Sequence, residues 1–350
     1  MASRVFLIQQ ETAAPAALWF LLLAFLGAAY VASLTLRLLA YLELYLRRRW
    51  PNNLRHRYGL WAVVTGPTSG IGRAMALELA RRGLSLVLVD LNAANLREIA
   101  GTIRSRHAVD TKTVVFDLSL ISTPHGDEPL RRLREAVEGV DVGVVVNNAG
   151  VGRPGAVYLH EADVEAWVRM MRVNLRAVTE VTAAVLPGMV ARGRGAVVNI
   201  GSASSEAIPS FPLCTMYAAT KRYIAQFSRS LHVEYASEGI HVQCQAPFFV
   251  ATRMVAGLVE ARRLSPFTVT PEAYARAAVG WIGHDGAVCT PSVRHQLLWC
   301  IAAAVPDSVL DWFLLRNHLE QRALLQRIRA SRAPSPSSSQ HELHSRGKLS

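Results

Sequence analysis

The stretch Thr65-Gly66-Pro67-Thr68-Ser69-Gly70-Ile71-Gly72 lies between an apolar run over residues 61–65 and an amphipathic run over residues 73–82. The first run predicts a short strand and the second predicts a helix. Glycines between them let the backbone approach a phosphate, which the N–H groups and the positive dipole at the start of the helix attract. A glycine cluster alone also fits an ordinary loop, but a position between strand and helix favours a dinucleotide site. The predicted cofactor contacts are Gly66, Thr68, Ser69, Gly70, Ile71 and Gly72.

An acidic residue ends the next predicted strand, over residues 84–90. Asp90 lies 18 residues beyond Gly72, where a carboxylate can accept hydrogen bonds from the adenosine ribose hydroxyls. The same carboxylate repels a 2′-phosphate, and Leu91 offers no cation to hold one. These residues therefore favour NAD(H). The alternative role of Asp90 is to cap the helix that begins near Asn92.

Two further strand-like runs follow, over residues 113–117 and 142–147. The first ends at Asp117, whose carboxylate is placed to reach the adenine, and the second is apolar enough to be buried on both faces. Strands that alternate with helical runs predict an α/β fold. The expected architecture is a doubly wound parallel sheet of the Rossmann type, folded as a single domain.

Tyr217 and Lys221 are four residues apart, so on a helix they share one face, with Cβ atoms roughly 6 Å apart. A free tyrosine, with a pKa of about 10, is a poor acid–base catalyst at neutral pH. We expect the Lys221 ammonium and the charged nicotinamide ring to lower the pKa of Tyr217, and we expect Lys221 to hydrogen-bond the nicotinamide ribose. Such a pair is common on protein surfaces by chance. Here it follows a strand-like run over residues 196–200 and a serine-rich loop, which favours a catalytic pair.

Three motifs occur in a fixed order: the glycine turn, Asn147-Asn148-Ala149-Gly150, and Tyr217 with Lys221. Together they resemble the short-chain dehydrogenase/reductase family over about residues 50–310. The resemblance implies an oxidoreductase that transfers hydride with NAD(P)(H), with Asn148 at the cofactor. It also implies that Asn174 holds a water in the proton relay through its backbone. Without the resemblance, Asn174 is a polar residue satisfied within a helix.

The family's catalytic serine lies just past the fifth strand and at a set distance before the tyrosine. Counting from the strand end gives Ser202, whereas counting back from the tyrosine gives Ser204. We favour Ser202, because the strand end fixes its position while the loop absorbs an insertion; Ser204 and Ser205 are the alternatives. The implied catalytic residues are Asn174, Ser202, Tyr217 and Lys221.

Pro247 and Phe248 follow the sixth predicted strand, where most of the family has Pro-Gly. This departure resembles the membrane-bound branch that contains very-long-chain 3-oxoacyl-CoA reductases, the plant ones in particular, and 17β-hydroxysteroid dehydrogenases of types 3 and 12. In that branch Val250 and Thr252 would meet the nicotinamide carboxamide. Its members use NADPH and usually have an arginine where this chain has Leu91.

The resemblance and the local residues therefore disagree about the cofactor. Asp90 followed by Leu91 favours NAD(H), whereas the branch implies NADP(H). Arg73 is an alternative ligand for a 2′-phosphate because it lies close in sequence to the glycine turn.

The branch implies reduction of a long-chain 3-oxoacyl-CoA to the 3-hydroxyacyl-CoA in fatty-acid elongation. The alternative substrate is a 17β-hydroxysteroid or another lipid ketone or alcohol. A cofactor-binding scaffold without turnover is a remote alternative, against which the presence of Ser202, Tyr217 and Lys221 argues. Fatty-acid elongation enzymes are candidate partners, and a homodimer is left open.

Residues 13–36 are 24 uncharged and mostly apolar positions, and about 20 are enough to span a bilayer as a helix. A cleaved signal peptide is the alternative, but its apolar core would be too long, and only Arg4 precedes it as a basic charge. Three arginines at 47–49 follow, and the positive-inside bias places the rest of the chain in the cytosol. We therefore expect a single-pass anchor in the endoplasmic reticulum membrane with a cytosolic catalytic domain.

The expected organisation has six parts. They are a tail over 1–12, the membrane helix over 13–36, a basic juxtamembrane linker over 37–60, the short-chain dehydrogenase/reductase domain over 61–315, a C-terminal amphipathic helix over 316–330 and a disordered tail over 331–350. The apolar run over 297–305 is too short to span a bilayer. It fits packing in the core, or else an amphipathic patch on the membrane or a lid over the substrate site.

The charge distribution bears on the partners. The net charge is +12, and residues 1–60 and 316–350 each hold seven basic and two acidic side chains. The centre of the chain is therefore nearly neutral, which argues against nucleic-acid binding and for basic ends that lie against anionic lipid. The four cysteines show no metal-ligand spacing, so we expect free thiols, as in a reducing cytosol, and no metal site.

Overall fold

The computed structural model describes residues 18–36, 39, 43, 53–152, 156–254, 266–284 and 286–332. The chain divides into two compact units, Met1–Pro51 and Asn52–Ser350. The first unit contains the helix Leu18–Leu36, whose mean hydropathy is 2.0 and of which no part is buried. This helix is long and apolar enough to cross a bilayer, as expected for the span over 13–36. Residues 1–17 lie outside the described part of the chain.

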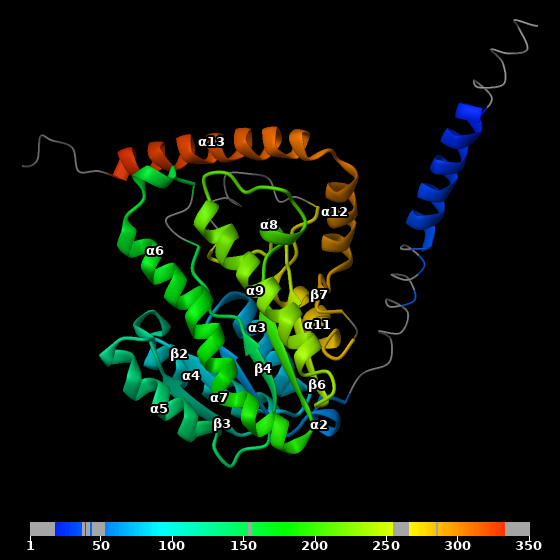
Figure 1. Cartoon of the computed structure of the whole chain (residues 1–350). Helices are drawn as coiled ribbons and strands as arrows, with labels where there is room; N and C mark the ends of the chain where they lie inside the picture. Colours follow the sequence, from blue (N-terminus) through cyan, green and yellow to red (C-terminus); the bar gives the residue numbers. More distant parts are fainter. Residues whose placement is uncertain are drawn as a thin grey trace, which may run out of the picture. The chain divides into compact units, whose positions relative to one another are not determined.

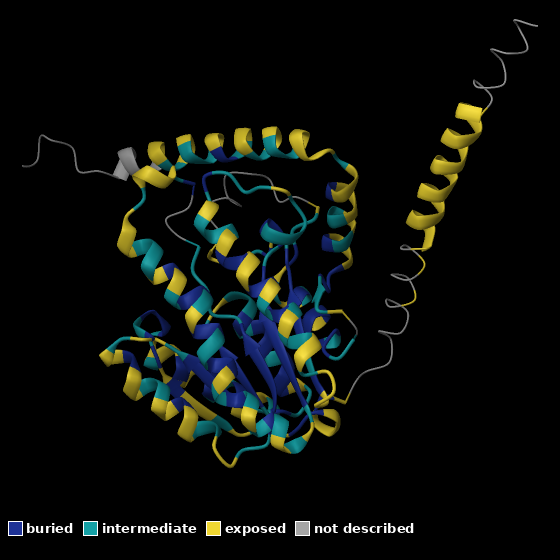
Figure 2. Ribbon diagram, viewed as in Figure 1, coloured by how far each residue is buried: buried dark blue, intermediate teal, exposed yellow. Residues whose placement is uncertain are grey.

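The second unit is built on a seven-stranded parallel sheet with the order β3-β2-β1-β4-β5-β6-β7 (Figure 1). This is the doubly wound Rossmann-type sheet that the sequence predicts. Strands β4 and β5 are buried along their whole length, because helices cover both faces of the sheet (Figure 2). The strands are β1 (Trp61–Thr65), β2 (Ser85–Asp90), β3 (Thr111–Val115), β4 (Val142–Asn147), β5 (Gly195–Ile200), β6 (Ile240–Gln245) and β7 (Val288–Cys289).

Alternate residues of one strand enter two hydrophobic cores, since successive side chains point to opposite faces of the sheet. In β1, Ala62 and Val64 pack beneath α3, α4 and α11, whereas Val63 packs beneath α5 and α7. The helices around the sheet are α2 (Leu54–Arg57), α3 (Gly70–Arg81), α4 (Ala93–His107), α5 (Pro124–Val137), α6 (Val164–Met171), α7 (Ala177–Arg192), α8 (Ala203–Glu206), α9 (Thr215–Glu234) and α11 (Pro271–Gly280). The described part of this unit also contains three short turns: η1 (Leu118–Leu120), η2 (Leu159–Glu161) and the π-helical turn η3 (Arg172–Arg176).

The folded unit begins earlier than the sequence suggests. Residues 54–60 belong to the linker expected over 37–60, yet Leu54 and Tyr58 are each only 1 % exposed and pack into the core beneath α3. Their spacing of four residues places both side chains on one face of α2. The sequence does not reveal this short apolar face, because the basic residues Arg55, His56 and Arg57 separate Leu54 from Tyr58.

Two helices, α12 (Val293–Ala304) and α13 (Asp307–Arg332), end the described chain. The chain turns by 119° between them. The helix expected over 316–330 instead begins at Asp307, because Pro306 interrupts helical hydrogen bonding and an acidic residue suits the first turn. Residues 333–350 of the expected tail lie outside the described residues.

Candidate active site

A glycine turn joins β1 to α3 and forms a cradle for a dinucleotide. Gly66 and Gly70 have φ angles of 67° and 53°, which glycine adopts without strain. A Cβ atom on Gly72 would lie 2.1 Å from the carbonyl oxygen of Gly66, so no side chain fits there. Within the described chain, Ser69 at the start of α3 makes no side-chain cap, which leaves the first N–H groups of the helix for a phosphate. The turn therefore fits the predicted cofactor.

Thr65 and Asn148 brace this turn from behind. The Oγ1 atom of Thr65 accepts the backbone N–H groups of Asn148 and Ala149, each at 3.0 Å. In return, Nδ2 of Asn148 donates to the carbonyl oxygens of Thr65 at 3.1 Å and Gly66 at 3.2 Å. The sequence singles out Asn148 as a cofactor contact, whereas the structure uses its amide to hold the turn. Thr65 was missed, although it ends β1 directly before the first glycine.

Asp90 ends β2 and faces the glycine turn. Its Oδ2 atom accepts the Thr68 hydroxyl at 2.8 Å, and its Oδ1 atom accepts the N–H of Leu91 at 2.8 Å. The alternative role as a helix cap is wrong, because Asn92 caps α4 by accepting the N–H of Asn95 at 3.0 Å. The structure therefore places the Asp90 carboxylate beside the turn, where the adenosine ribose of a bound dinucleotide would lie.

Asp117 and Arg73, the two other residues proposed near the adenosine, each interact with a neighbouring residue of the chain. The Oδ1 atom of Asp117 accepts the N–H of Ser119 at 2.9 Å and so begins η1. The Arg73 guanidinium lies 3.7 Å from the Glu98 carboxylate, and both side chains are largely exposed. An exposed pair of this kind is weak, so Arg73 remains free to exchange partners.

Lys221 reaches under the end of β5 from α9. Its Nζ atom donates to the carbonyl oxygen of Ile200 at 2.8 Å and lies 5.9 Å from the centre of the Tyr217 ring. Only 7 % of Lys221 is exposed, and this burial lowers its pKa to about 8. The spacing of four residues on one helix therefore places the amine and the phenol on one face, as the sequence predicts.

The pKa of Tyr217 corrects an expectation. Burial raises it above the usual value of 10.0, and this effect outweighs the Ser202 side chain, whose hydrogen bond lowers it. We expected the Lys221 ammonium to lower the pKa, but Lys221 is itself desolvated and directs its Nζ atom at the Ile200 carbonyl. The phenol is therefore protonated at neutral pH, the form that a proton donor needs.

Ser202 lies two residues past the end of β5 and caps the N-terminus of α8. Its Oγ atom accepts the N–H of Ser204 at 3.1 Å and the hydroxyl of Ser204 at 2.8 Å. The Ser205 hydroxyl donates to the Ser202 carbonyl oxygen at 3.0 Å. Both alternative serines thus support Ser202, which is the serine that interacts with Tyr217.

Asn174 occupies the π-helical turn η3 and is 1 % exposed. Its Oδ1 atom accepts the N–H of Val151 at 2.8 Å, and its Nδ2 atom donates to the Val151 carbonyl at 2.9 Å and to Thr220 Oγ1 at 3.1 Å. The side chain ties the segment after β4 to α9. A π-helical turn is common at functional sites because it changes the backbone hydrogen-bond pattern.

The segment after β6 closes the other side of the site. A Cβ atom on Gly70 would lie 3.0 Å from Cγ2 of Thr252, so Thr252 contacts the start of α3. Val250 is buried and forms a β-bridge with Val269. The structure therefore brings the two predicted carboxamide contacts and the glycine turn to one edge of the sheet.

His295, which no sequence motif indicates, fastens this segment to α12. Its Nδ1 atom accepts the N–H of Phe248 at 3.4 Å, and its Nε2–H donates to the carbonyl oxygen of Phe249 at 3.2 Å. Burial lowers the pKa of His295 to about 4, so the ring is neutral and makes both bonds at once. The backbone groups that follow Pro247 are therefore held by a side chain some 50 residues away.

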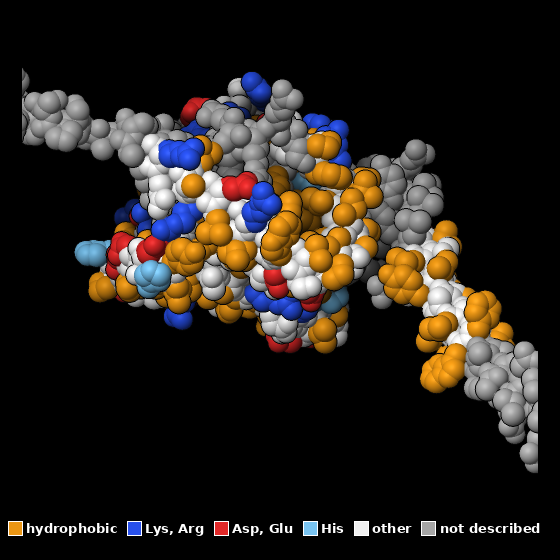
Figure 3. Space-filling view, turned by 90° about the horizontal axis from the view of Figure 1, so that it is seen from above, with side chains coloured by type: hydrophobic (Ala, Val, Ile, Leu, Met, Phe, Trp, Pro, Cys, Tyr) orange, Lys and Arg blue, Asp and Glu red, His pale blue; other side chains and the backbone are white. Residues whose placement is uncertain are grey.

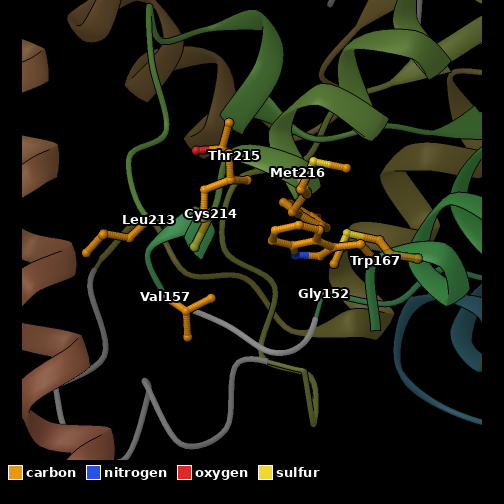
Figure 4. Close-up of a pocket in the computed structure, with 10 residues that line it drawn as sticks. Gly152, Val157, Trp167, Leu213, Cys214, Thr215 and Met216 are labelled. Atoms are coloured by element: carbon orange, nitrogen blue, oxygen red, sulfur yellow. The ribbon is translucent and has the colours of Figure 1, made fainter. Parts of the chain in front are cut away.

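A small pocket is lined by Tyr217 and nine other residues, seven of which Figure 4 labels. It is lined by Trp167 and Met170 of α6, by Leu213 of the loop before α9, by Met216 in the first turn of α9, and by the segment after β4. Burial raises the pKa of Cys214, another lining residue, to about 11, so the group there is a neutral thiol. The lining side chains are therefore mostly apolar, and Thr215 and Tyr217 are the two lining residues that carry a hydroxyl. Spacing alone did not single out Trp167 or Leu213, because distant segments build this pocket.

A family model described as short chain dehydrogenase matches residues 60–263. The chain belongs to this family. A very-long-chain 3-oxoacyl-CoA reductase-like protein of Arabidopsis thaliana is 42 % identical over 275 residues, 78 % of this chain and 86 % of that protein. A very-long-chain 3-oxoacyl-CoA reductase of Anas platyrhynchos is 36 % identical over 76 % of this chain and 82 % of that protein. An inactive hydroxysteroid dehydrogenase-like protein 1 of Homo sapiens is 34 % identical over 91 % of this chain and 97 % of that protein.

Among solved structures, a short-chain dehydrogenase from Sphingobium yanoikuyae in complex with NADPH superposes with a TM-score of 0.60 at 29 % identity. The match covers 69 % of this chain and 92 % of that one. The short-chain dehydrogenase described here is thus an NAD(P)(H)-dependent oxidoreductase, in agreement with its glycine cradle.

Proposed function

We propose that this short-chain dehydrogenase reduces a long-chain 3-oxoacyl-CoA to the 3-hydroxyacyl-CoA, as a step of fatty-acid elongation. The observation that carries the proposal is a mostly apolar pocket that has Tyr217, a protonated phenol, among its lining residues. The names of the Arabidopsis and Anas relatives support the same substrate class. A single apolar N-terminal helix fits an enzyme whose substrate is a lipid.

In this proposal, the chain's own residues orient the ketone and supply its proton. Bound NAD(P)H supplies the hydride that reduces the carbonyl carbon. The Ser202 hydroxyl hydrogen-bonds the carbonyl oxygen, and the Tyr217 phenol transfers its proton to that oxygen as negative charge develops on it. Lys221 then stabilises the phenolate, and a proton returns to Tyr217 from solvent by way of a water that the Asn174 backbone would hold. Electrons and protons balance, since one hydride and one proton convert the ketone to the alcohol.

The rate of reduction is expected to fall above about pH 8 because Lys221, with a pKa of about 8, then loses its proton. The pKa of Tyr217 is raised, so the phenol stays protonated through that range. A pH profile of kcat/KM for ketone reduction measures this limb. The matched variant Lys221→Arg stays charged to higher pH, so the fall in kcat/KM should move to higher pH in this variant. A wild-type profile that stays flat to pH 10 would show that Lys221 is not the titrating group.

The substrate is tested with the full-length protein in detergent, given each reduced cofactor and a series of 3-oxoacyl-CoA chain lengths. A series of 17-ketosteroids is the parallel assay, because a steroid or another lipid ketone is the alternative substrate. We expect kcat/KM to rise with acyl chain length, as more of the chain enters the apolar pocket. Higher kcat/KM for the steroids would replace the acyl-CoA proposal with the alternative.

The remote alternative is a cofactor-binding scaffold without turnover, and the inactive human relative is a reason to weigh it. Against it, Ser202, Tyr217 and Lys221 are all present and lie together at the end of β5. Cofactor binding without turnover of either substrate series would support the scaffold.

For the cofactor, we propose a preference for NADH of about tenfold or more, since desolvated like charges at a binding interface cost several kcal/mol. The Asp90 carboxylate, held by Thr68 beside the turn, would face a 2′-phosphate as a like charge. Leu91 is 59 % exposed and supplies neither an ion pair nor a stacking surface for the adenine. The ratio of kcat/KM for NADH and NADPH measures the preference, and Asp90→Ser with Leu91→Arg should shift it towards NADPH. A wild-type preference for NADPH would contradict the proposal and direct attention to Arg73.

For the location, we propose that Leu18–Leu36 anchors the protein in the endoplasmic reticulum membrane with its catalytic unit in the cytosol. The three arginines at 47–49 support this orientation. The protein should stay in the membrane pellet after alkaline carbonate extraction, and protease outside intact microsomes should digest the catalytic unit. A protease-protected catalytic unit would reverse the orientation, and release by carbonate would argue against the anchor.

A further inference from the structure

Two helices at the C-terminal end expose a patch of large apolar side chains. On α12, Val293 is 44 % exposed, Leu297 55 % and Ile301 45 %. Their spacing of four residues places them in one row along the helix. On α13, Val309, Trp312 and Phe313 are each at least half exposed. The six side chains are called the corner patch: Val293, Leu297, Ile301, Val309, Trp312 and Phe313.

Each side chain of the corner patch is at least 44 % exposed. Figure 3, which views the molecule from above, shows hydrophobic side chains gathered on the face in view. Scattered apolar residues are normal on a surface, but an extended apolar patch marks contact with a partner or a membrane. Core packing explains only the opposite side of α12, where His295 and Ala302 are buried.

The chemistry of the corner patch suits a lipid surface. Among the described residues of α12, Arg294 is the one charged side chain that the helix exposes. The Arg316 guanidinium lies 5.7 Å from the centre of the Trp312 ring, an aromatic–cationic pair that suits the boundary between acyl chains and headgroups. Helices α12 and α13, taken together to Arg327, have the length and apolar composition of a membrane segment, although the chain bends by 119° between them.

The same chain brings this unit to a bilayer. The apolar helix Leu18–Leu36 is long enough to cross a membrane, and residues 37–52 join it to the catalytic unit. Sixteen residues reach at most about 55 Å when fully extended. These residues hold four arginines and one glutamate, a charge that favours anionic lipid. A tether of this length keeps the corner patch at a high local concentration beside the lipid.

We propose that the corner patch inserts into the bilayer interface as a second membrane contact of the chain. The inner side of α13 makes this contact relevant to the site. The His318 ring bonds the Pro212 carbonyl oxygen at 2.6 Å, and Arg322 pairs with Glu161 of η2. The two segments that these contacts bind to α13 also contribute to the pocket wall, one through Leu213 and the other through Leu159. Docking therefore places the pocket wall beside the lipid, and, on the proposed function, a lipid substrate has a short path to Tyr217.

The test is a depth measurement on the full chain in phosphatidylcholine vesicles that contain phosphatidylserine. Leu297→Cys, in a Cys300→Ser background, carries an environment-sensitive fluorophore at the corner patch. Val233→Cys in the same background is the matched control, because Val233 is 76 % exposed on α9, outside the corner patch. The labelled Cys300→Ser parent corrects for the three remaining cysteines. The anchor helix is unchanged in every variant, so all of them stay in the vesicle.

The expected result is a blue-shifted emission at position 297 that nitroxide-labelled lipids quench several-fold more than the emission at position 233. Adding Trp312→Glu and Phe313→Glu should return the emission at 297 towards that of water. Equal, water-like emission at both positions would overturn the proposal. A blue shift at 297 that lipid nitroxides do not quench, and that fades when the protein is diluted in the vesicles, would overturn it in favour of a second copy of the chain. Because no readout is catalytic, failure here is distinguishable from failure of the proposed reaction.

Discussion

Tyr217→Phe is expected to lower kcat for ketone reduction by at least about 100-fold, within the range for loss of a positioned general acid. The substitution removes the phenol proton and leaves the ring, the neighbouring Lys221 and its bond to the Ile200 carbonyl in place. The glycine cradle lies at the end of β1 rather than on α9, so the affinity for the cofactor should change little. Single-turnover rates with saturating cofactor measure the chemical step, and fluorescence titration measures cofactor binding.

The matched control is Tyr223→Phe, on the same helix. The Tyr223 hydroxyl lies 2.9 Å from Thr179 Oγ1, and the residue is 37 % exposed, so its loss should leave kcat near the wild-type value. The two serine variants refine the result. Ser202→Ala should impair turnover more than Ser204→Ala, because Ser202 is the serine that interacts with Tyr217. Near wild-type turnover by Tyr217→Phe would remove the proposed mechanism.

Gly72→Ala is expected to abolish measurable cofactor binding and to lower the free energy of unfolding by about 1–3 kcal/mol, the usual range for overpacking. The added Cβ would lie 2.1 Å from the Gly66 carbonyl oxygen and 2.3 Å from Nδ2 of Asn148. The Gly66 carbonyl belongs to the backbone, and the Asn148 amide is held by two hydrogen bonds to the turn. Neither can move away from the added Cβ without opening the turn. Chemical denaturation and cofactor titration on the same preparation measure the two effects.

Gly101→Ala is the control for this prediction. Gly101 lies within α4, and an added Cβ there meets no heavy atom within 4 Å. Alanine in a helix interior should instead raise the free energy of unfolding by roughly 0.5–1 kcal/mol, with cofactor binding unchanged. Tight cofactor binding by Gly72→Ala would show that the dinucleotide does not depend on the close approach of β1 and α3.

Local sequence order predicts much of the candidate site. Tyr217 and Lys221 share a helix face because they are four residues apart, and Asp90 lies beside the glycine turn because parallel strands end at one edge of the sheet. Ser202 was favoured over Ser204 for the same reason, since a strand end fixes a position more firmly than a loop does. The inferences about Lys221 and Asp90 need only helix and strand geometry, whereas the inference about Ser202 also needs the family resemblance.

Protonation states could not be read in this way. The raised pKa of Tyr217 and the lowered pKa of Lys221 both follow from burial by segments that are distant in sequence. The spacing of four residues places the Lys221 ammonium near the Tyr217 phenol, but it does not predict how strongly burial removes either group from water. The expected direction for Tyr217 was therefore wrong for the protein without its cofactor.

The sequence by itself determined the family, the doubly wound sheet, the glycine cradle and the apolar N-terminal helix, because each rests on short motifs or on the local pattern of apolar residues. Only the tertiary structure decided that Asn148 braces the turn, that His295 holds the segment before Val250, and that α13 grips the pocket wall through His318 and Arg322. It also decided that one side of α12 is buried while Leu297 and Ile301 are exposed. These contacts join residues from some 50 to 160 positions apart, and such pairs depend on how the layers pack rather than on any local period.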